Sequence, residues 1–164
     1  MQRRLPALDG VLMKTINIPI QITLNVINDI LAIAIEGGIN YWCSYYTGHS
    51  SGLPDLPENK VEIDYNWEHL TYGGENAYLT FYEDVSDRNS ENFDSDGNYK
   101  WTDNQHVLKK DNLYQGIEKW IQKNPQTVEI IWEKRIQTLE MGNLDAGDCD
   151  QIIQYALFSE LKYG

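Results

Sequence analysis

Apolar residues recur with two different periods along this chain, and the mixture restricts it to folds that combine helices with strands. A helical period predicts helices over 26–36, 112–123 and 146–158. Alternation of apolar and polar residues predicts strands instead, and the strands expected are 14–24, 61–65, 77–82 and 105–109. The expected fold class is therefore α+β, a small and mainly antiparallel sheet with three or four helices packed on one face.

The expected helices carry residue types that commonly cap helix ends. Asn25 and Asp111 are predicted N-caps, because their side chains can accept hydrogen bonds from free backbone N–H groups. Asp145 and Asp148 have the spacing of a capping box, and capping with dipole complementarity also accounts for Asp150. The core expected from the helical faces contains Ile27, Ile30, Leu31, Ile117, Trp120, Ile152, Ile153, Ala156 and Leu157.

Other stretches are less regular. The glycines at 37–38 are expected to end the first helix, one of them with positive φ. The sequence INYWC at 39–43 fits either a further helical turn or a buried strand. A helix is expected to begin at Thr127 and to end at Gly142, although its opening TVEIIW fits a strand equally well. The range 44–59 is predicted to be a loop, and 84–104 a long polar excursion between strands.

One domain is expected for a chain of 164 residues. Residues 1–13 are predicted to be a mobile N-terminal extension, and both Met1 and Met13 remain candidates for the natural start. Residues 14–164 would then form a single α+β domain with an acidic, aromatic-rich insertion around 55–103.

The polar composition and the two cysteines indicate a cytoplasmic protein. Polar residues interrupt the apolar stretch 16–35, so a membrane span is not expected there. Cys43 and Cys149 are isolated from one another in the sequence and do not suggest a disulfide framework, which favours a reducing compartment.

Negative charge is concentrated in the middle of the chain. The net charge is −12, and the range 55–103 contributes −10 of it, with thirteen acidic and three basic residues. Such a charge disfavours direct contact with nucleic acid or an anionic membrane and suits a basic protein surface. Acids would steer the approach and aromatic rings would supply contact area. The residues predicted to bind the partner are Asp87, Glu91, Asp94, Asp96, Tyr99 and Trp101.

The sequence GHSSG at 48–52 has the literal form of a hydrolase nucleophile motif around Ser50. The motif requires a helix directly after the serine, and the nearby prolines at positions 54 and 57 oppose one. A hydrolase that combines Ser50 with His69 or His106 is therefore the last-ranked function, and no catalytic residue is assigned.

Cation sites and cofactors are not expected. The loop 92–103 has acids at the spacing of a calcium-binding loop, but its first and last positions depart from that pattern, so a solvated acidic loop is preferred. The histidines and cysteines are too scattered for a zinc site, and Cys149 is interpreted as a small buried apolar residue.

Three stretches resemble a family of short, uncharacterised proteins from phages and prophages of Gram-positive bacteria. They are DILAIAIEGGINYWC at 29–43, DNLYQGIEKWI at 111–121 and DAGDCDQIIQYALFSELKYG at 145–164. The most specific parts are EGGINYWC and IIQYALF followed by Tyr-Gly. The resemblance implies a viral protein from a small phage accessory gene, a class often devoted to host takeover or counter-defence, located in the cytoplasm of the bacterial host.

These observations lead to a ranked functional expectation. The first is a non-enzymatic phage inhibitor that binds a host protein, for example the basic nucleic-acid-binding surface of a CRISPR-type nuclease. The alternative is a protein that sequesters a nucleotide immune signal in an aromatic pocket made by Tyr41, Trp42, Tyr45 and Tyr46. The oligomeric state stays open, with a homodimer as one option.

Overall fold

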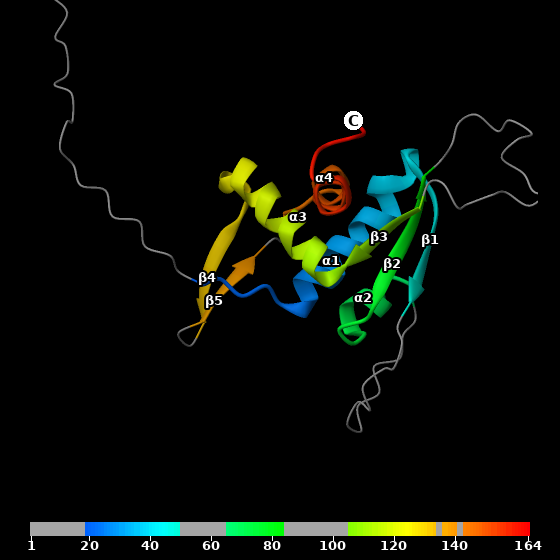
Figure 1. Ribbon diagram of the computed structural model, residues 1–164. Coiled ribbons are helices and arrows are strands. Elements are labelled where there is room, and N and C mark those ends of the chain that lie inside the picture. Colours follow the sequence, from blue (N-terminus) through cyan, green and yellow to red (C-terminus); the bar gives the residue numbers. More distant parts are fainter. Residues whose placement is uncertain (1–18, 50–64, 84–104, 134–135, 141–142) are drawn as a thin grey trace, which may run out of the picture.

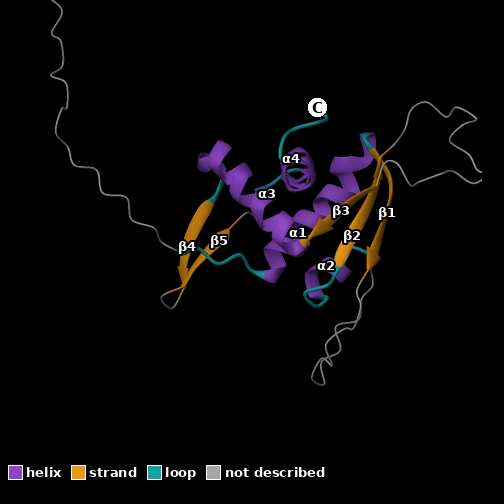
Figure 2. Ribbon diagram, in the orientation of Figure 1, coloured by secondary structure: helices purple, strands orange, loops and turns teal. Residues whose placement is uncertain are grey.

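The computed structural model describes residues 19–49, 65–83, 105–133, 136–140 and 143–164 (Figure 1). These residues form an α+β fold, as predicted, in which four α-helices accompany a three-stranded and a two-stranded antiparallel sheet (Figure 2). The helices are α1 (Leu24–Ile33), α2 (Glu68–Tyr72), α3 (Lys110–Lys123) and α4 (Ala146–Phe158). The strands are β1 (Cys43–His49), β2 (Tyr78–Glu83), β3 (Gln105–Lys109), β4 (Glu129–Glu133) and β5 (Ile136–Glu140).

The three-stranded sheet has the order β1-β2-β3 with both pairs antiparallel. Leu79 and Phe81 of β2 and Leu108 of β3 are fully buried, since the helices cover this side of the sheet (Figure 2). The alternating pattern correctly predicted β2 and β3, at 77–82 and 105–109. The third strand is β1 rather than 14–24, and its residues lie largely in a range that was predicted to be a loop.

The predicted strand 14–24 is wrong within its described part. Residues 19–23 make only an isolated parallel bridge between Gln21 and Thr138, and α1 already begins at Leu24. The alternation of isoleucines is real, but without a neighbouring strand to complete a ladder it does not produce a sheet. Of the predicted strand 61–65 only Tyr65 lies among the described residues, where it forms a bend.

Helices α3 and α4 pack closely against each other. At Gly116, a Cβ atom would lie 2.6 Å from the carbonyl oxygen of Ile152 and 2.7 Å from Cβ of Ala156, so only glycine allows this approach. The hydrophobic core of the molecule contains all nine predicted core residues. Leu157 is half-buried at the edge of this core, and the other eight are buried.

Two predicted N-caps are wrong. Thr23, not Asn25, caps α1, because Thr23 has an extended backbone and its Oγ1 accepts a hydrogen bond from Val26 N at 3.3 Å. Lys109 precedes α3, and Asp111 lies inside its first turn, where a carboxylate still favours the helix dipole. The predicted capping box of α4 is confirmed (Asp145 with Asp148).

The end of the first helix also differs from the prediction. Helix α1 continues into a π-helical turn, Ala34–Gly38, and a 3₁₀ turn, Ile39–Tyr41, before β1 begins at Cys43. Gly38 has a φ of −86°, so positive φ is not the reason for this glycine. A Cβ atom there would lie 2.4 Å from the carbonyl oxygen of Ala146, and glycine is needed for close contact with α4.

The structure also decides between the alternatives for 39–43 and 127–142. Residues 39–43 combine both options, since a 3₁₀ turn leads directly into β1. The range 127–142 contains the hairpin of β4 and β5 instead of a helix. This hairpin lies apart from the three-stranded sheet, on the other side of α3 (Figure 1).

Candidate functional site

A buried carboxylate connects α4 to the turn before β1. Asp150 is 4% exposed, and its Oδ1 accepts a hydrogen bond from Trp42 Nε1 at 2.7 Å. Its Oδ2 accepts from Tyr41 Oη at 2.7 Å and from Gln154 Nε2 at 2.7 Å. Burial, followed by the hydrogen bond to Asp150 and its charge, raises the pKa of Tyr41 to about 12. Asp150 therefore accepts hydrogen bonds from three neutral donors. The sequence predicted only helix capping and an interaction with the helix dipole for this residue.

The next buried polar residue of α4, Gln154, holds the backbone that follows the helix. Ser159 ends α4 in a left-handed conformation with a φ of 62° and turns the chain back toward the helix. Gln154 Oε1 then accepts hydrogen bonds from the backbone N–H groups of Lys162, at 2.9 Å, and Tyr163, at 2.8 Å. Gln154 Nε2 lies 3.0 Å from the carbonyl oxygen of Tyr163 and donates to it. One side chain thus binds three backbone groups of residues 160–164.

Aromatic rings complete the site that holds residues 160–164, which we call the seat. The ring of Tyr163 stacks on Trp42 with 5.3 Å between centroids and an angle of 2° between planes. Phe158 meets both rings edge-on, at 5.8 Å from Trp42 and 5.8 Å from Tyr163. Such contacts stabilise by about 0.5–1.5 kcal/mol each beyond the area that they bury.

A partly buried carboxylate binds the Lys162 side chain. Glu83 Oε1 accepts hydrogen bonds from Lys162 Nζ at 2.5 Å and from His106 Nε2 at 2.7 Å. Burial alone would raise the pKa of Glu83, but the hydrogen bonds from Lys162, Tyr163 and His106 outweigh burial and lower it. Glu83 is therefore the anionic end of the seat.

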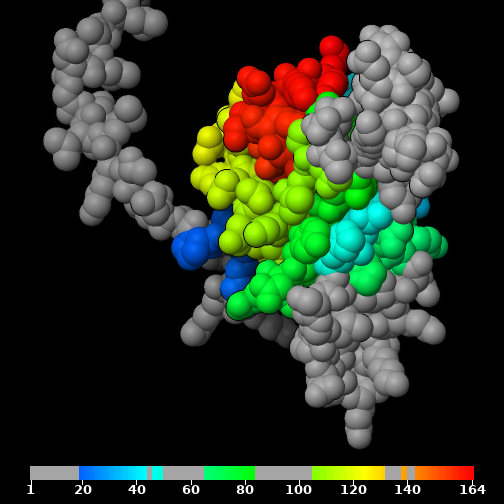
Figure 3. Space-filling view, turned by 45° about the vertical axis from the view of Figure 1, so that its right-hand side comes forward, coloured from blue at the N-terminus to red at the C-terminus, as the bar shows by residue number. Residues whose placement is uncertain are grey.

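We call this group the C-terminal cluster. Its members come from the turn before β1, from β2 and β3, and from α4 with the residues after it. Figure 3 shows the C-terminal part of the chain, in red, at the surface of the molecule above α3. The cluster consists of Tyr41, Trp42, Glu83, His106, Asp150, Gln154, Phe158, Lys162 and Tyr163.

The sequence did not predict this cluster, although one signal pointed to it. Asp150 and Gln154 are polar residues four apart on a helix whose neighbouring buried positions are apolar. Tyr41 and Trp42 lie 108 to 113 residues away, so their contacts with this pair depend on the tertiary fold. The stretches EGGINYWC and IIQYALF with Tyr-Gly meet at this cluster.

The predicted partner-binding residues lie outside the described residues: Asp87, Glu91, Asp94, Asp96, Tyr99 and Trp101. The calcium-like range 92–103 also lies outside them. The structure does place both ends of this segment, because Glu83 ends β2 and Gln105 begins β3, paired with Tyr82. The residues on either side of 84–104, Glu83 and Gln105, therefore lie in or next to the C-terminal cluster.

The residues considered for hydrolysis lie apart in the described structure. His69 lies beside Gly48, where a Cβ atom would come within 2.6 Å of its ring. His106 pairs with Phe81 near the opposite end of β2 and binds Glu83. Ser50 is outside the described residues, so the structure separates the two histidines and leaves the nucleophile unplaced.

The four aromatic residues considered for a nucleotide pocket have other surroundings. Trp42 is 2% exposed, and both its Nε1 and the hydroxyl of Tyr41 bind Asp150. Tyr46 is half-buried and stacks on Phe81, and the Tyr45 side chain is outside the described residues. The polar atoms of Tyr41 and Trp42 thus already have a protein partner.

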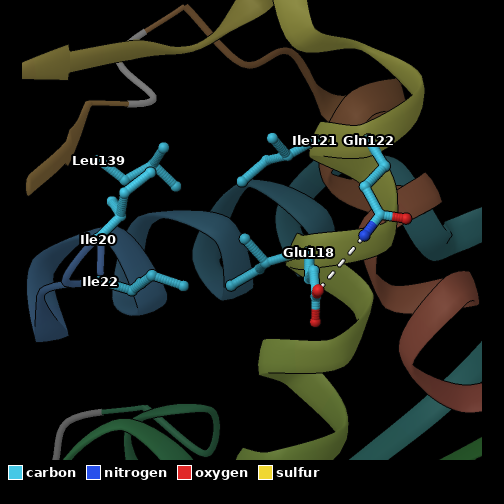
Figure 4. A pocket seen from close by; sticks show the side chains of 7 residues that line it. Ile20, Ile22, Glu118, Ile121, Gln122 and Leu139 are labelled. Atoms are coloured by element: carbon cyan, nitrogen blue, oxygen red, sulfur yellow. Dashed lines mark hydrogen bonds between the residues drawn. The ribbon is translucent and has the colours of Figure 1, made fainter. Parts of the chain in front are cut away.

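An apolar groove of about 340 Å³ lies between the residues before α1, helix α3 and Leu139 of β5 (Figure 4). Its polar lining residues are Glu118 and Gln122, which bind each other at 3.3 Å. A nucleotide phosphate is usually bound by cations or backbone N–H groups, and none of the side chains lining this groove is basic.

The buried cysteine Cys149 and the helices add no further chemical site to the described residues. Cys149 is fully buried, as predicted, and burial together with Asp148, Asp145 and Asp29 raises its thiol pKa to about 12. Among the described residues, no three His, Cys, Asp or Glu side chains gather as metal ligands would. No helix in the described ranges has the length and apolar composition needed to cross a bilayer. No family model, curated protein or solved structure matches this chain.

Proposed function

We propose that this protein is a non-enzymatic phage protein that binds and blocks a host protein through a basic surface of that host protein. The observation that carries the proposal is the charge of the range 55–103, which holds −10 of the net −12. A CRISPR-type nuclease, whose nucleic-acid-binding surface is basic, has the kind of surface that this charge would attract. The phage origin and the counter-defence role rest on the resemblance of 29–43, 111–121 and 145–164.

The described part of this range supports the electrostatic argument. Residues 65–83 contain Glu68, Glu75 and Glu83 and no lysine or arginine. Of the nearby lysines, Lys110 donates through Nζ to the carbonyl oxygen of Gly73 at 3.0 Å and Lys162 binds Glu83, while the exposed Lys109 lies opposite Tyr78. Lys162 offsets the charge of Glu83 at long range, so the negative field that a partner meets comes from the other acidic residues of 55–103.

An aromatic side chain of the same range is available for contact. Tyr65 is 55% exposed and stacks on the buried Trp67, with 4.4 Å between ring centroids. A ring held rigidly by a buried neighbour loses little conformational freedom on binding. This arrangement is typical of an aromatic residue at a protein interface.

Binding kinetics against a host protein test the proposal. The host protein would be recovered from lysate by pull-down at low salt and identified. The quadruple variant Asp87→Asn, Glu91→Gln, Asp94→Asn, Asp96→Asn should then associate about tenfold more slowly at low salt, with a weaker dependence on salt. Long-range attraction between the carboxylates and the basic surface is the physical reason.

A matched control separates local charge from net charge. Neutralising Glu36, Asp111, Glu118 and Glu129, which are exposed and lie outside 55–103, removes the same number of charges. This control should associate at nearly the wild-type rate. Equal rates for the wild type and the first variant at low salt would contradict the proposal, and equal slowing by both variants would reduce it to an effect of net charge.

A further inference from the structure

Residues 160–164 occupy a seat with the properties of a peptide-binding site. The buried amide of Gln154 binds both the N–H and the carbonyl group of Tyr163. Peptide-recognition sites commonly obtain affinity from such main-chain contacts and specificity from side-chain pockets. Because every amino acid other than proline has these two backbone groups, the Gln154 contacts do not by themselves require this particular segment.

Two side-chain positions of the seat do select a sequence. Trp42 presents its face to an aromatic ring, which Tyr163 supplies at a plane angle of 2°. Glu83 accepts a hydrogen bond from the ammonium group of the preceding residue, Lys162, at 2.5 Å. The ligand that fits is therefore a lysine followed directly by an aromatic residue.

The occupying residues lie at the surface, and Tyr163 packs half-buried against the edge of the core, so a ligand that replaces it must also cover Trp42. Leu161 is 46% exposed, and the side chain of Lys162 is 42% exposed. The residues that form the seat are much less exposed: Gln154 is fully buried and Trp42 is 2% exposed. The seat is built by the packed elements, while its occupant is joined to α4 only through Ser159 and Glu160.

We propose that the seat formed by Trp42, Glu83 and Gln154 is a recognition site for a lysine-aromatic segment of the partner protein, which displaces this chain's own Lys162–Tyr163. The choice of a partner protein as the source of that segment rests on the proposed function. The position of the site agrees with it, because the acidic segment 84–104 begins directly after Glu83. A basic partner steered by that segment would arrive beside the seat.

Competition between the two segments sets the expected affinities. A ligand attached to its site by a short linker has an effective concentration on the order of millimolar or higher. An external peptide should therefore bind the wild-type chain weakly, and weakening the internal ligand should reveal the site. A partner held at a second point by the acidic segment would gain the same kind of advantage.

The test uses the full chain and a fluorescent peptide, Ser-Glu-Leu-Lys-Tyr-Gly, which copies residues 159–164. Tyr163→Ala should bind this peptide at least about tenfold more tightly than the wild type does, because the internal ligand no longer competes fully. Adding Glu83→Gln to that variant should weaken peptide binding again. Control peptides with Ala for Tyr, or Glu for Lys, should bind at least about tenfold more weakly than the parent peptide.

A second variant guards against a folding defect. Lys162→Glu opposes Glu83 and loosens the segment without removing the Tyr163 ring, and circular dichroism checks that both variants are folded. If neither folded variant binds the peptide at millimolar concentration, the proposal is overturned. If the wild-type protein is a dimer and Tyr163→Ala makes it monomeric, the seat binds a second copy of the chain. That result would also overturn the proposal.

The peptide assay and the host-protein kinetics can fail separately. The assay contains no host protein, so its failure does not affect the proposed electrostatic function. Conversely, unchanged association of the quadruple variant with the host protein would leave a positive peptide result standing. The two proposals are tested by different molecules and different residues.

Discussion

The C-terminal cluster and the β4–β5 hairpin are attached to the molecule in different ways. In the cluster, Asp150 and Gln154 bind groups from two other parts of the chain, 41–42 and 162–163, and stacked rings fill the space around them. The hairpin meets the residues before α1 through the Gln21–Thr138 bridge, with a hydrogen bond from Leu139 N to Gln21 O at 3.1 Å. Its Leu139 side chain is buried, at 3% exposure.

The hairpin also leaves large apolar residues of β4 exposed. Ile130 is 46% exposed and Ile131 is 38% exposed, and successive residues of a strand point to opposite faces. An isolated two-stranded hairpin is marginally stable in water, so Leu139 and the bridge must supply much of what holds it. The comparison teaches that local stability in this fold depends on how many elements meet at a point, and we expect the hairpin to open before the cluster.

The largest expected effect is on the cluster side of the comparison. Asp150→Ala should lower the free energy of unfolding by about 3 kcal/mol, because the buried Trp42 and Gln154 donors would lose a charged acceptor. Urea denaturation measures this loss. Glu75→Ala, at an exposed position, is the control and should change stability by less than about 0.5 kcal/mol. A loss below about 1 kcal/mol for Asp150→Ala would show that the cluster is not a stabilising centre.

The next effect tests the attachment of the hairpin. Leu139→Ala should cost about 2 kcal/mol, at the low end for a buried leucine, because the hairpin can open locally without the core. Amide hydrogen exchange should become faster in β4 and β5 while the amides of α4 keep their protection. Equally faster exchange in α4 would mean that the hairpin and the core unfold as one unit. That result would contradict the expectation that the hairpin opens before the cluster.

The third prediction concerns pH and Glu83. A carboxyl group whose pKa is lowered by folding stabilises the fold above its unfolded pKa, and this contribution is lost as the pH falls through the folded value. Stability should therefore fall from about pH 5 downward, starting near the ordinary pKa of glutamate. Glu83→Gln should cost about 1 kcal/mol at pH 7 and should flatten this part of the pH profile. A profile in this pH range as steep as that of the wild type would exclude Glu83 as a source of it.

The smallest effect is expected at Ile130 and Ile131, two exposed residues of the hairpin. Ile130→Thr and Ile131→Thr should each change the free energy of unfolding by less than about 0.5 kcal/mol, since both residues are exposed and threonine suits a strand. Urea denaturation and size-exclusion chromatography are the measurements. A larger loss that depends on protein concentration would instead show that a second copy covers β4, which would favour the homodimer.

Local signals explain which parts of the fold could be predicted. Helix α4 matches its predicted range, 146–158, because a capping box marks its start and apolar residues follow at helical spacing. β3 matches 105–109 for a similar reason, since its pattern lies within the strand itself. The predicted strand 14–24 failed because alternation specifies a face but does not supply a neighbouring strand.

The candidate site could not be predicted because it depends on contacts between distant residues. Glu83 and Lys162 are 79 residues apart in sequence, and Trp42 and Asp150 are 108 apart. No local period connects such pairs, and their residue types are ordinary for a strand end and a helix. The acidic segment was recognised from composition alone, which identified its charge but not the cluster beside it.

The π-helical turn at Ala34–Gly38 has a consequence for how the length of this region can vary. Each residue added to or removed from a regular helix rotates everything after it by about 100°. Tyr41 and Trp42 follow this turn, and both must point at Asp150. The number of residues between Thr23 and Trp42 therefore decides whether the side chains of Tyr41 and Trp42 face Asp150. This stretch should tolerate changes of residue type far better than insertions or deletions.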